Sequence, residues 1–243
     1  MILTAHQPLY LGHLALFDKI AQADEFVIFD VCPAEDSGFE NRNKILTQTG
    51  ELMLTVPIRR SRSAPLSEIR IVEDSSWQRK HWKSIEAAYR KARFWEYYAP
   101  TLEPFYMGIR WQLLVELDEV LLRWCMNALG LRRPIRRAST LGPLAGTKSE
   151  LVLSMCKAVG ATTYVFGKLG RDYADVPAFE RAGIEVRFQD YQHPTYPQTQ
   201  PGFTSGLSVL DLLMNAGPDS LKVLRNGGGS WSSESSSRSY SSV

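Results

Sequence analysis

The chain opens with a short apolar segment and an abrupt break. Residues Met1 to Thr4 form an apolar run, and Pro8 and Gly12 interrupt regular structure soon afterwards. A short run bounded in this way predicts a buried β-strand. His6 and Gln7 are therefore expected at the carboxyl end of the first strand.

A helix and a second strand are predicted directly after this break. Apolar residues recur at helical spacing over residues 14–21, and residues 26–29 form another apolar run that ends at Asp30. A strand, a helix and a second buried strand in this order are typical of a parallel sheet. Ligands of open parallel sheets bind beyond the carboxyl ends of the strands, so His6, Gln7, His13 and Asp30 are expected at one cleft.

The next part of the chain predicts a β-hairpin. Residues 45–47 and 52–56 have the composition of strands and flank a polar turn. Asn41, Arg42 and Asn43 precede the first of these strands, where two amides and a forked guanidinium can hold a carboxylate or a phosphate. The alternative is an asparagine-rich turn that carries a surface arginine.

Three amphipathic segments predict a helical insert at about residues 75–130. They cover residues 77–92, 94–106 and 111–129, and their many aromatic residues favour a packed core over a cofactor site. His81 lies on the first of these helices. Its position is compatible with a histidine packed in the core and equally with a histidine that contacts a ligand.

The alternation of strands and helices then resumes. Four arginines between residues 132 and 137 flank a proline, and so short a charged run predicts a solvated edge. A predicted helix ends at Gly160, and apolar runs at residues 163–166 and 184–188 predict two more buried strands.

A loop with two prolines follows the last predicted strand. Residues 189–198 present Tyr191, His193, Tyr196 and Gln198 on a backbone that the prolines restrict. Loops that follow strands are where binding residues concentrate. The loop is therefore expected to contribute to the same cleft as the first strand.

These elements predict an α/β fold with a mostly parallel sheet, flanking helices, a β-hairpin and a helical insert. Residues 1–225 are expected to form a single domain. Residues 226–243 are rich in serine and glycine and have almost nothing to bury, so a disordered tail is expected there.

Composition limits the classes of function. The chain has 243 residues, of which 44% are hydrophobic, and a formal net charge of +2. That charge is too small to suggest nucleic acid as a partner, and no apolar run is long enough to predict a membrane span. The first residues lack the basic region and the cleavage site of a signal peptide, so a cytoplasmic location is expected.

Short motifs along the chain resemble those of the WbqC-like family. In chain order they are His6-Gln7-Pro8 with Tyr10-Leu11, Phe17-Asp18-Lys19-Ile20, Ala23-Asp24, Asp30, Asn41-Arg42-Asn43-Lys44-Ile45, Leu54-Thr55-Val56-Pro57, Trp77 with Lys80-His81, Tyr164 with Gly167, Tyr191 with His193-Pro194, Tyr196 with Gln198, and Ser208 with Asp211-Leu212-Leu213. The resemblance runs from Met1 to about Gly217. It implies a role in bacterial surface-polysaccharide (O-antigen) biosynthesis, with transfer of an aminoacyl or acyl group to a nucleotide-linked amino sugar as the expected reaction.

The segment after the first strand departs from that family. Gly12-His13 stands where the family has Pro-Trp, which leaves the role of His13 open. The same segment is similar to the His-x-Gly-His turn of nucleotidyltransferases, in which histidines and a helix N-terminus stabilise phosphate charge, although the first histidine of that motif is missing here. This second likeness favours a nucleotide-binding α/β sheet.

The favoured function is a transferase that acts on a small molecule bearing a phosphate or a nucleotide. A histidine can take a proton from an attacking amine or hydroxyl, so His6 or His193 is the expected general base. The catalytic candidates are His6, His193 and Asp30. The candidates for substrate binding are Gln7, Tyr10, Asn41, Arg42, Asn43, His81, Tyr191, Tyr196 and Gln198.

Two other classes of function stay open at this point. A metal-dependent hydrolase would use His6, Asp30, His81 and His193 as mixed nitrogen and oxygen ligands, although none of them has the i, i+4 spacing of a helical metal motif. A non-catalytic binding protein would use the aromatic helical insert as an interface. The sequence identifies neither a cofactor nor an oligomeric state.

Overall fold

A five-stranded parallel sheet forms the centre of the computed structural model, which describes residues 1–34, 38–59, 63–74 and 76–226. The strand order is β7-β2-β1-β8-β9, and every neighbouring pair is parallel. The strands are β1 (Ile2–His6), β2 (Glu25–Ile28), β7 (Ile135–Arg137), β8 (Thr163–Phe166) and β9 (Glu185–Phe188). The predicted α/β class is confirmed, whereas the tail expected at the end of the chain lies outside the described residues from 227 onward.

Both faces of the sheet are buried. Successive side chains of a strand point to opposite faces, so neighbouring residues pack into different apolar clusters. Leu3 and Val27 pack into one apolar cluster with helix α6, whereas Phe26 and Ile28 pack into the other with helix α1. This explains why the predicted strands appear in the sequence as continuous apolar runs and not as alternating ones.

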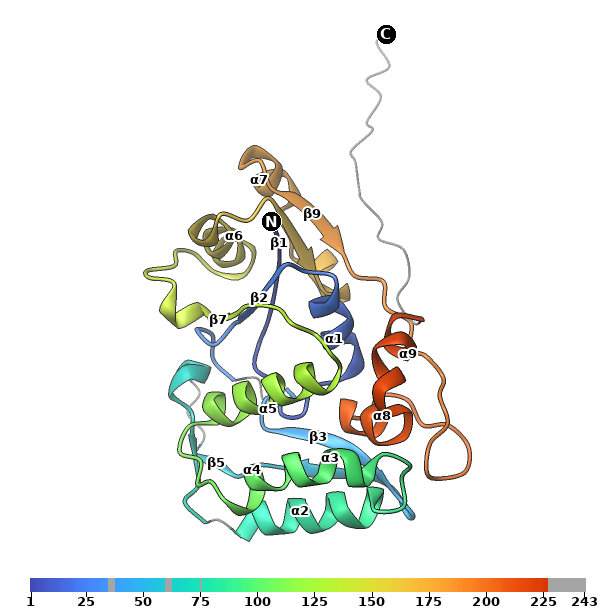
Figure 1. Cartoon of the computed structure of the whole chain (residues 1–243). Helices are drawn as coiled ribbons and strands as arrows, with labels where there is room; N and C mark the ends of the chain where they lie inside the picture. The colour runs from blue at the N-terminus through green and yellow to red at the C-terminus, as the bar shows by residue number, and fades with distance from the viewer. Residues whose placement is uncertain (35–37, 60–62, 75, 227–243) are drawn as a thin grey trace.

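Helices cover the sheet and form a separate layer beside it (Figure 1). The helices are α1 (Leu14–Ala21), α2 (Ser76–Tyr89), α3 (Trp95–Leu102), α4 (Pro104–Met107), α5 (Leu114–Ala128), α6 (Lys148–Val159), α7 (Val176–Arg181), α8 (Val209–Ala216) and α9 (Ser220–Asn226). No helix in this described part of the chain combines the length and apolarity that crossing a bilayer requires.

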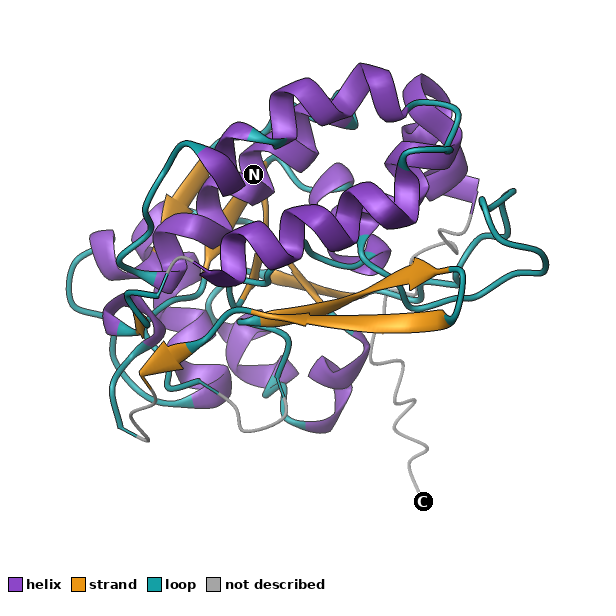
Figure 2. Ribbon diagram, turned by 90° about the horizontal axis from the view of Figure 1, so that it is seen from below, coloured by secondary structure: helices purple, strands orange, loops and turns teal. Residues whose placement is uncertain are grey.

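The predicted hairpin is an antiparallel pair outside the main sheet. It consists of β3 (Arg42–Thr47) and β4 (Gly50–Thr55), and a smaller pair consists of β5 (Ile58–Arg59) and β6 (Arg70–Ile71). Seen from below, the hairpin is a long ribbon with helices of the insert beside it (Figure 2). Helix α2 contacts β3, so the insert and the hairpin support one another.

Three elements differ from the prediction. The arginine-rich segment forms the edge strand β7. Helix α9 was not among the predicted elements, and its Leu224 packs fully buried against the core. The helix expected at residues 94–106 is divided into α3 and α4 at Pro104, which cannot continue a preceding helix but suits the first turn of a new one.

The turn after β1 is held in an unusual backbone conformation. Leu11 has a positive φ of 50°, in the left-handed region that non-glycine residues seldom adopt. The Leu11 carbonyl accepts hydrogen bonds from Asn43 Nδ2 at 3.1 Å and from Ser208 Oγ at 2.7 Å. Contacts from β3 and from the start of α8 thus fix the turn that leads into α1.

Replacing Asn43 by alanine is expected to destabilise the fold by about 2–4 kcal/mol. Asn43 is buried and also donates to the Tyr10 carbonyl, so the variant leaves two buried carbonyls short of a donor. Chemical denaturation measures the free energy of unfolding.

The neighbouring Lys44→Ala variant is the control. Lys44 pairs with Glu51 at the surface, so its loss should cost less than about 1 kcal/mol. Equal stability of the two variants would contradict a structural role for the Asn43 amide.

Candidate functional site

Four basic side chains gather near the carboxyl ends of the parallel strands. His6 ends β1, His13 precedes α1, Lys19 lies on α1, and His193 lies in the loop after β9. The His6 and His13 rings meet edge to face with centroids 6.0 Å apart. The charge of Lys19 acts on both of these rings, and His193 acts on His13, so the four side chains form one electrostatic cluster.

Lys19 is a buried cation in this cluster. Only 3% of its surface is exposed, and its Nζ donates to the Ala5 carbonyl at 2.9 Å. Burial lowers its pKa from 10.5 to about 8, which leaves the ammonium charged at neutral pH. Within the described residues no carboxylate lies at ion-pair distance from Lys19, so an anionic ligand would supply the missing counter-charge.

Sequence reasoning did not identify Lys19 as a site residue. A lysine on an amphipathic helix is normally expected to reach solvent, and only long-range packing buries this one. The signal that was present is its position directly between Asp18 and Ile20, in the middle of a segment that is otherwise largely apolar.

Local hydrogen bonds fix the tautomers of the two clustered histidines. His13 caps α1, and its Nδ1 accepts from the Leu16 N–H at 3.2 Å, so its proton lies on Nε2. His6 has the opposite arrangement, because its Nδ1 donates to the Gln7 carbonyl at 2.9 Å. His13 therefore offers a donor at Nε2, whereas His6 offers a lone pair at Nε2.

Both rings are neutral at physiological pH. Burial, together with Lys19 and His13, lowers the pKa of His6 from 6.5 to about 3. Burial and Lys19 likewise lower the pKa of His13 to about 4. Before a ligand binds, His6 is consequently a weak base and a good neutral hydrogen-bond acceptor.

The loop after β9 brings His193 to the cluster. Gln189 anchors the start of the loop, because its side chain donates to the Ala15 carbonyl and to Asp18 on α1. The Nδ1 of His193 donates to the Pro194 carbonyl at 2.9 Å, which leaves a lone pair on Nε2. That Nε2 is buried and has no hydrogen-bond partner within the described residues.

The other candidates in this loop support its shape. Gln198 donates to the Thr204 carbonyl and to Asp211 on α8, and accepts from the Thr204 N–H. Tyr196 is buried and stacks on His193 with ring centroids 6.3 Å apart. The Tyr191 ring meets the His193 ring edge to face, with ring centroids 6.4 Å apart. These residues hold His193 in place.

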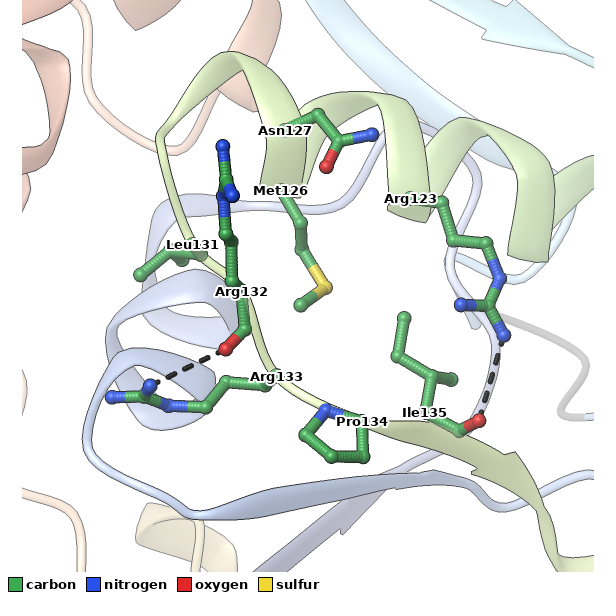
Figure 3. A pocket seen from close by; sticks show the side chains of 8 residues that line it. All are labelled: Arg123, Met126, Asn127, Leu131, Arg132, Arg133, Pro134 and Ile135. Atoms are coloured by element: carbon green, nitrogen blue, oxygen red, sulfur yellow. Dashed lines mark hydrogen bonds between the residues drawn. The ribbon is translucent and has the colours of Figure 1, made fainter.

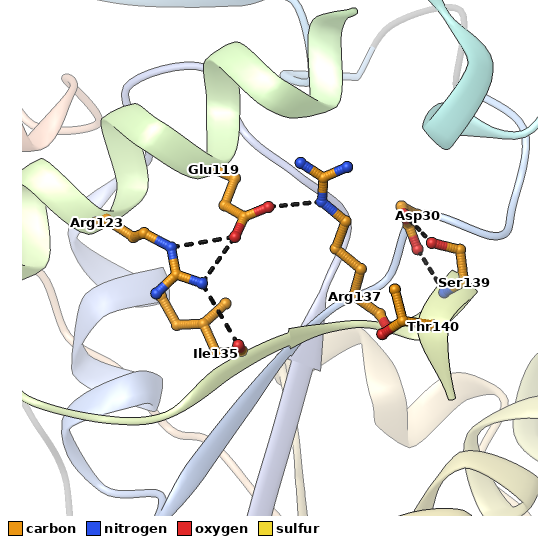
Figure 4. Close-up of polar contacts among 7 residues, drawn as sticks. All are labelled: Asp30, Glu119, Arg123, Ile135, Arg137, Ser139 and Thr140. Carbon is orange, nitrogen blue, oxygen red and sulfur yellow. Dashed lines mark hydrogen bonds and ion pairs between the residues drawn. The ribbon is translucent and has the colours of Figure 1, made fainter. Parts of the chain in front are cut away.

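Asp30 is occupied within the protein. It is fully buried, and its carboxylate accepts from the Ser139 N–H at 2.9 Å and from the Ser139 hydroxyl at 2.7 Å. Figure 4 shows this contact joining the end of β2 to the segment after β7, with the ion pairs of Glu119 to Arg123 and Arg137 drawn in the same view. Asp30 thus clamps two strand ends together, and within the described residues no hydrogen bond or ion pair joins its side chain to the histidine cluster.

Tyr10 and His81 form a separate buried network. The Tyr10 hydroxyl lies 2.8 Å from His81 Nδ1 and 2.8 Å from the Tyr106 hydroxyl. The His81 ring also packs against Trp77, and burial lowers its pKa to about 4. This network ties the turn after β1 to α2 and α4, and the packed interpretation of His81 fits these contacts.

The candidates at the start of the hairpin also have partners within the protein, and only Asn41 precedes β3, because the strand begins at Arg42, earlier than predicted. Asn41 Nδ2 donates to the Val56 carbonyl, and Arg42 Nε donates to the Gly38 carbonyl. Asn43 supports the turn after β1, as described above. Gln7 Nε2 lies 3.5 Å from Cys32 Sγ beyond the end of β1. Of the predicted candidates, the structure thus gathers His6 and His193 in one cluster, with Gln7 adjoining His6 in the chain.

The proposed metal ligands are not assembled. His81 hydrogen-bonds within the tyrosine network, and Asp30 is bound by Ser139. Neither of these networks includes His6 or His193. Residues 1–34, 38–59, 63–74 and 76–226 contain no group of three or more histidine, cysteine, aspartate or glutamate side chains that could hold a metal ion. The described residues therefore do not bring together the four ligands that the hydrolase alternative names.

Comparison with known proteins agrees with the sequence motifs. Residues 7–223 match the WbqC-like protein family. The chain is also 31% identical over 218 residues to "Uncharacterized protein Rv1507c" of Mycobacterium tuberculosis (strain ATCC 25618 / H37Rv), a match that covers 89% of this chain and 94% of that protein. No solved structure matches the chain.

The two clustered histidines are expected to make stability depend on pH. In the unfolded chain they take up protons below pH 6.5, whereas the folded protein does so only near pH 4 for His13 and near pH 3 for His6. The unfolded state then binds more protons, so the free energy of unfolding falls as pH drops from 6.5 toward 4, by up to about 1.4 kcal/mol per pH unit for each histidine.

Chemical denaturation of the natural chain and of a His6→Gln variant at several pH values isolates the contribution of His6 to the pH dependence of the free energy of unfolding. The variant should lose less stability on acidification than the natural chain. Histidine ring titration followed by NMR gives the midpoints directly, and midpoints near 6.5 for His6 and His13 would contradict the buried, neutral assignment.

Proposed function

Because the chain belongs to the WbqC-like protein family, we propose that it is a transferase of bacterial surface-polysaccharide biosynthesis. It passes an acyl or aminoacyl group to the amine of a nucleotide-linked amino sugar. The observation that supports this proposal most directly is Lys19, a buried cation without a carboxylate partner in the described structure, placed among three histidines at the strand ends.

The cluster suits a phosphate or a carboxylate ligand. A buried ammonium without a counter-ion costs free energy, and a bound anion offsets that cost. Nucleotide-linked sugars carry such an anion. Ligands of parallel sheets also bind beyond the carboxyl ends of strands, which is where β1 and the loop after β9 place these residues.

His193 is the proposed general base. Its buried Nε2 carries a lone pair and can take the proton that the attacking amine loses. The amine nitrogen forms a bond with the carbonyl carbon of the donor, and the bond from that carbon to the leaving group breaks. The leaving group departs with the bonding electron pair, and the proton on His193 is available to it.

His13 and His6 have complementary proposed roles. The His13 Nε2–H is a donor that can stabilise the oxyanion formed when the carbonyl is attacked. The His6 Nε2 lone pair accepts a hydrogen bond from the acceptor sugar and positions it. The low pKa of His6 makes it a positioning residue, and His193 is left as the base.

Replacing Lys19 by methionine is expected to weaken binding of nucleotide-linked sugars about tenfold or more, because the buried charge is lost. The fold should be retained, since methionine fills the same space without a buried charge. A thermal-shift screen finds the ligand, and calorimetry measures its affinity.

Lys157→Met is the matched control, because Lys157 lies exposed on α6. It should bind the same ligand as the natural chain does. Unchanged affinity in the Lys19 variant would show that its charge takes no part in binding.

Replacing His193 by glutamine is expected to lower turnover about 100-fold or more while binding of the amino-sugar substrate changes little, which is the effect of losing a general base. The measurement is acyl transfer to the nucleotide-linked amino sugar, with binding determined separately. A His6→Gln variant should mainly raise KM. Full turnover by the His193 variant would exclude His193 as the general base, whereas binding without any turnover by the natural chain would favour a non-catalytic binding protein.

A further inference from the structure

A pocket of about 330 Å³ opens where α5 ends and the chain enters β7 (Figure 3). Its apolar lining consists of Met126, Leu131, Pro134 and Ile135. Pockets for small molecules span roughly 300–1,000 Å³, so this one suits a small ligand.

This pocket is separate from the histidine cluster. It lies at the amino end of β7, whereas His6 and His193 lie at the carboxyl ends of β1 and β9. Strand β2 separates β7 from β1 in the sheet. None of the residues that line the pocket takes part in the contacts of the cluster.

The polar side of the pocket carries Arg123, Asn127, Arg132 and Arg133. Figure 3 shows the side chains of Asn127 and Arg132 close to each other at the rim, with Met126 pointing into the space below them. The pocket thus has a cationic, hydrogen-bonding rim above an apolar floor.

Local structure accounts for only part of this positive charge. Arg123 is paired with Glu119, and Arg133 Nη2 donates to the Ala21 carbonyl at the end of α1. Arg133 Nε is buried without an acceptor, and within the described residues neither the Arg132 guanidinium nor the Asn127 amide has a hydrogen bond or ion pair. Arginines near the end of α5 are favoured by the helix dipole, which attracts positive charge to the carboxyl end of a helix. The dipole does not explain why a hollow lies between these side chains.

We propose that this pocket is a second binding site, which takes a small phosphate monoester whose organic group is flat and apolar. The Arg132 guanidinium matches the phosphate oxygens with two parallel donors, whereas the Arg133 guanidinium points away from the pocket and donates to the Arg132 and Ala21 carbonyls. The floor of Met126, Leu131 and Ile135 covers the organic group, and the Asn127 amide, on the same side of the pocket as Arg132, donates to a phosphate oxygen.

Calorimetry on the full-length chain tests this site with phenyl phosphate as the probe. Binding in the millimolar range or tighter is expected, and it should weaken about tenfold in Arg132→Gln, which removes the charge at an exposed position. Asn127→Asp should also weaken binding, because it places a like charge beside the phosphate.

Two variants serve as controls. Arg79→Gln removes the same charge from an exposed position on α2 and should leave binding unchanged. Lys19→Met removes the proposed phosphate-binding charge of the histidine cluster, so binding that remains in this variant and is lost when Arg132→Gln is added belongs to this pocket, which makes failure of one proposal distinguishable from failure of the other.

Three results would overturn the proposal. These are absence of binding, equal affinity in Arg132→Gln and the natural chain, and loss of binding in Lys19→Met alone. Inorganic phosphate that binds as tightly as phenyl phosphate would overturn the assignment of the apolar floor.

Discussion

The carbonyl of Leu11 joins three distant parts of the chain. It accepts one hydrogen bond from Asn43 on the hairpin and another from Ser208 at the start of α8, while Leu11 itself is held at a positive φ. The turn that it fixes determines where α1 begins, and His13 caps that helix. The positions of His13 and Lys19 therefore depend on a backbone conformation that tertiary contacts impose.

Burial of Lys19 sets the electrostatics of the cluster. Burial of the rings is the largest cause of the low pKa of His6 and His13, and the buried ammonium of Lys19 lowers both pKa values further, because it disfavours a second positive charge nearby. An anion bound beside Lys19 would oppose this effect and raise the proton affinity of the same rings. Substrate binding and the protonation state of the cluster are thereby coupled.

Much of the fold could be predicted because its strands and helices have strong periodicity. The first strand, α1 and the hairpin follow from apolar runs, helical spacing and a polar turn. Strand β7 could not be predicted in this way, because two of its three residues are arginines. Its side chains are stabilised by pairing with Glu25 and Glu119, which are far away in the sequence.

The candidate site could be predicted only in part for a similar reason. His6 and His193 follow strands, and position alone suggests a cleft. The sequence does not show whether a polar side chain before a strand contacts a ligand or the protein's own backbone, so Asn41 and Asn43 looked like ligand residues. Lys19 could not be identified because its burial depends on the packing of the whole domain.

The shortness of β7 also affects how copies of this chain meet. An edge strand exposes backbone groups that the edge of another sheet can pair with, and such pairing leads to aggregation. Here the edge is three residues long and carries Arg136 and Arg137. Since Arg136 and Arg137 are engaged by Glu25 and Glu119, the main protection comes from the shortness of the strand, which offers a neighbouring strand few backbone groups to pair with at this edge of the sheet.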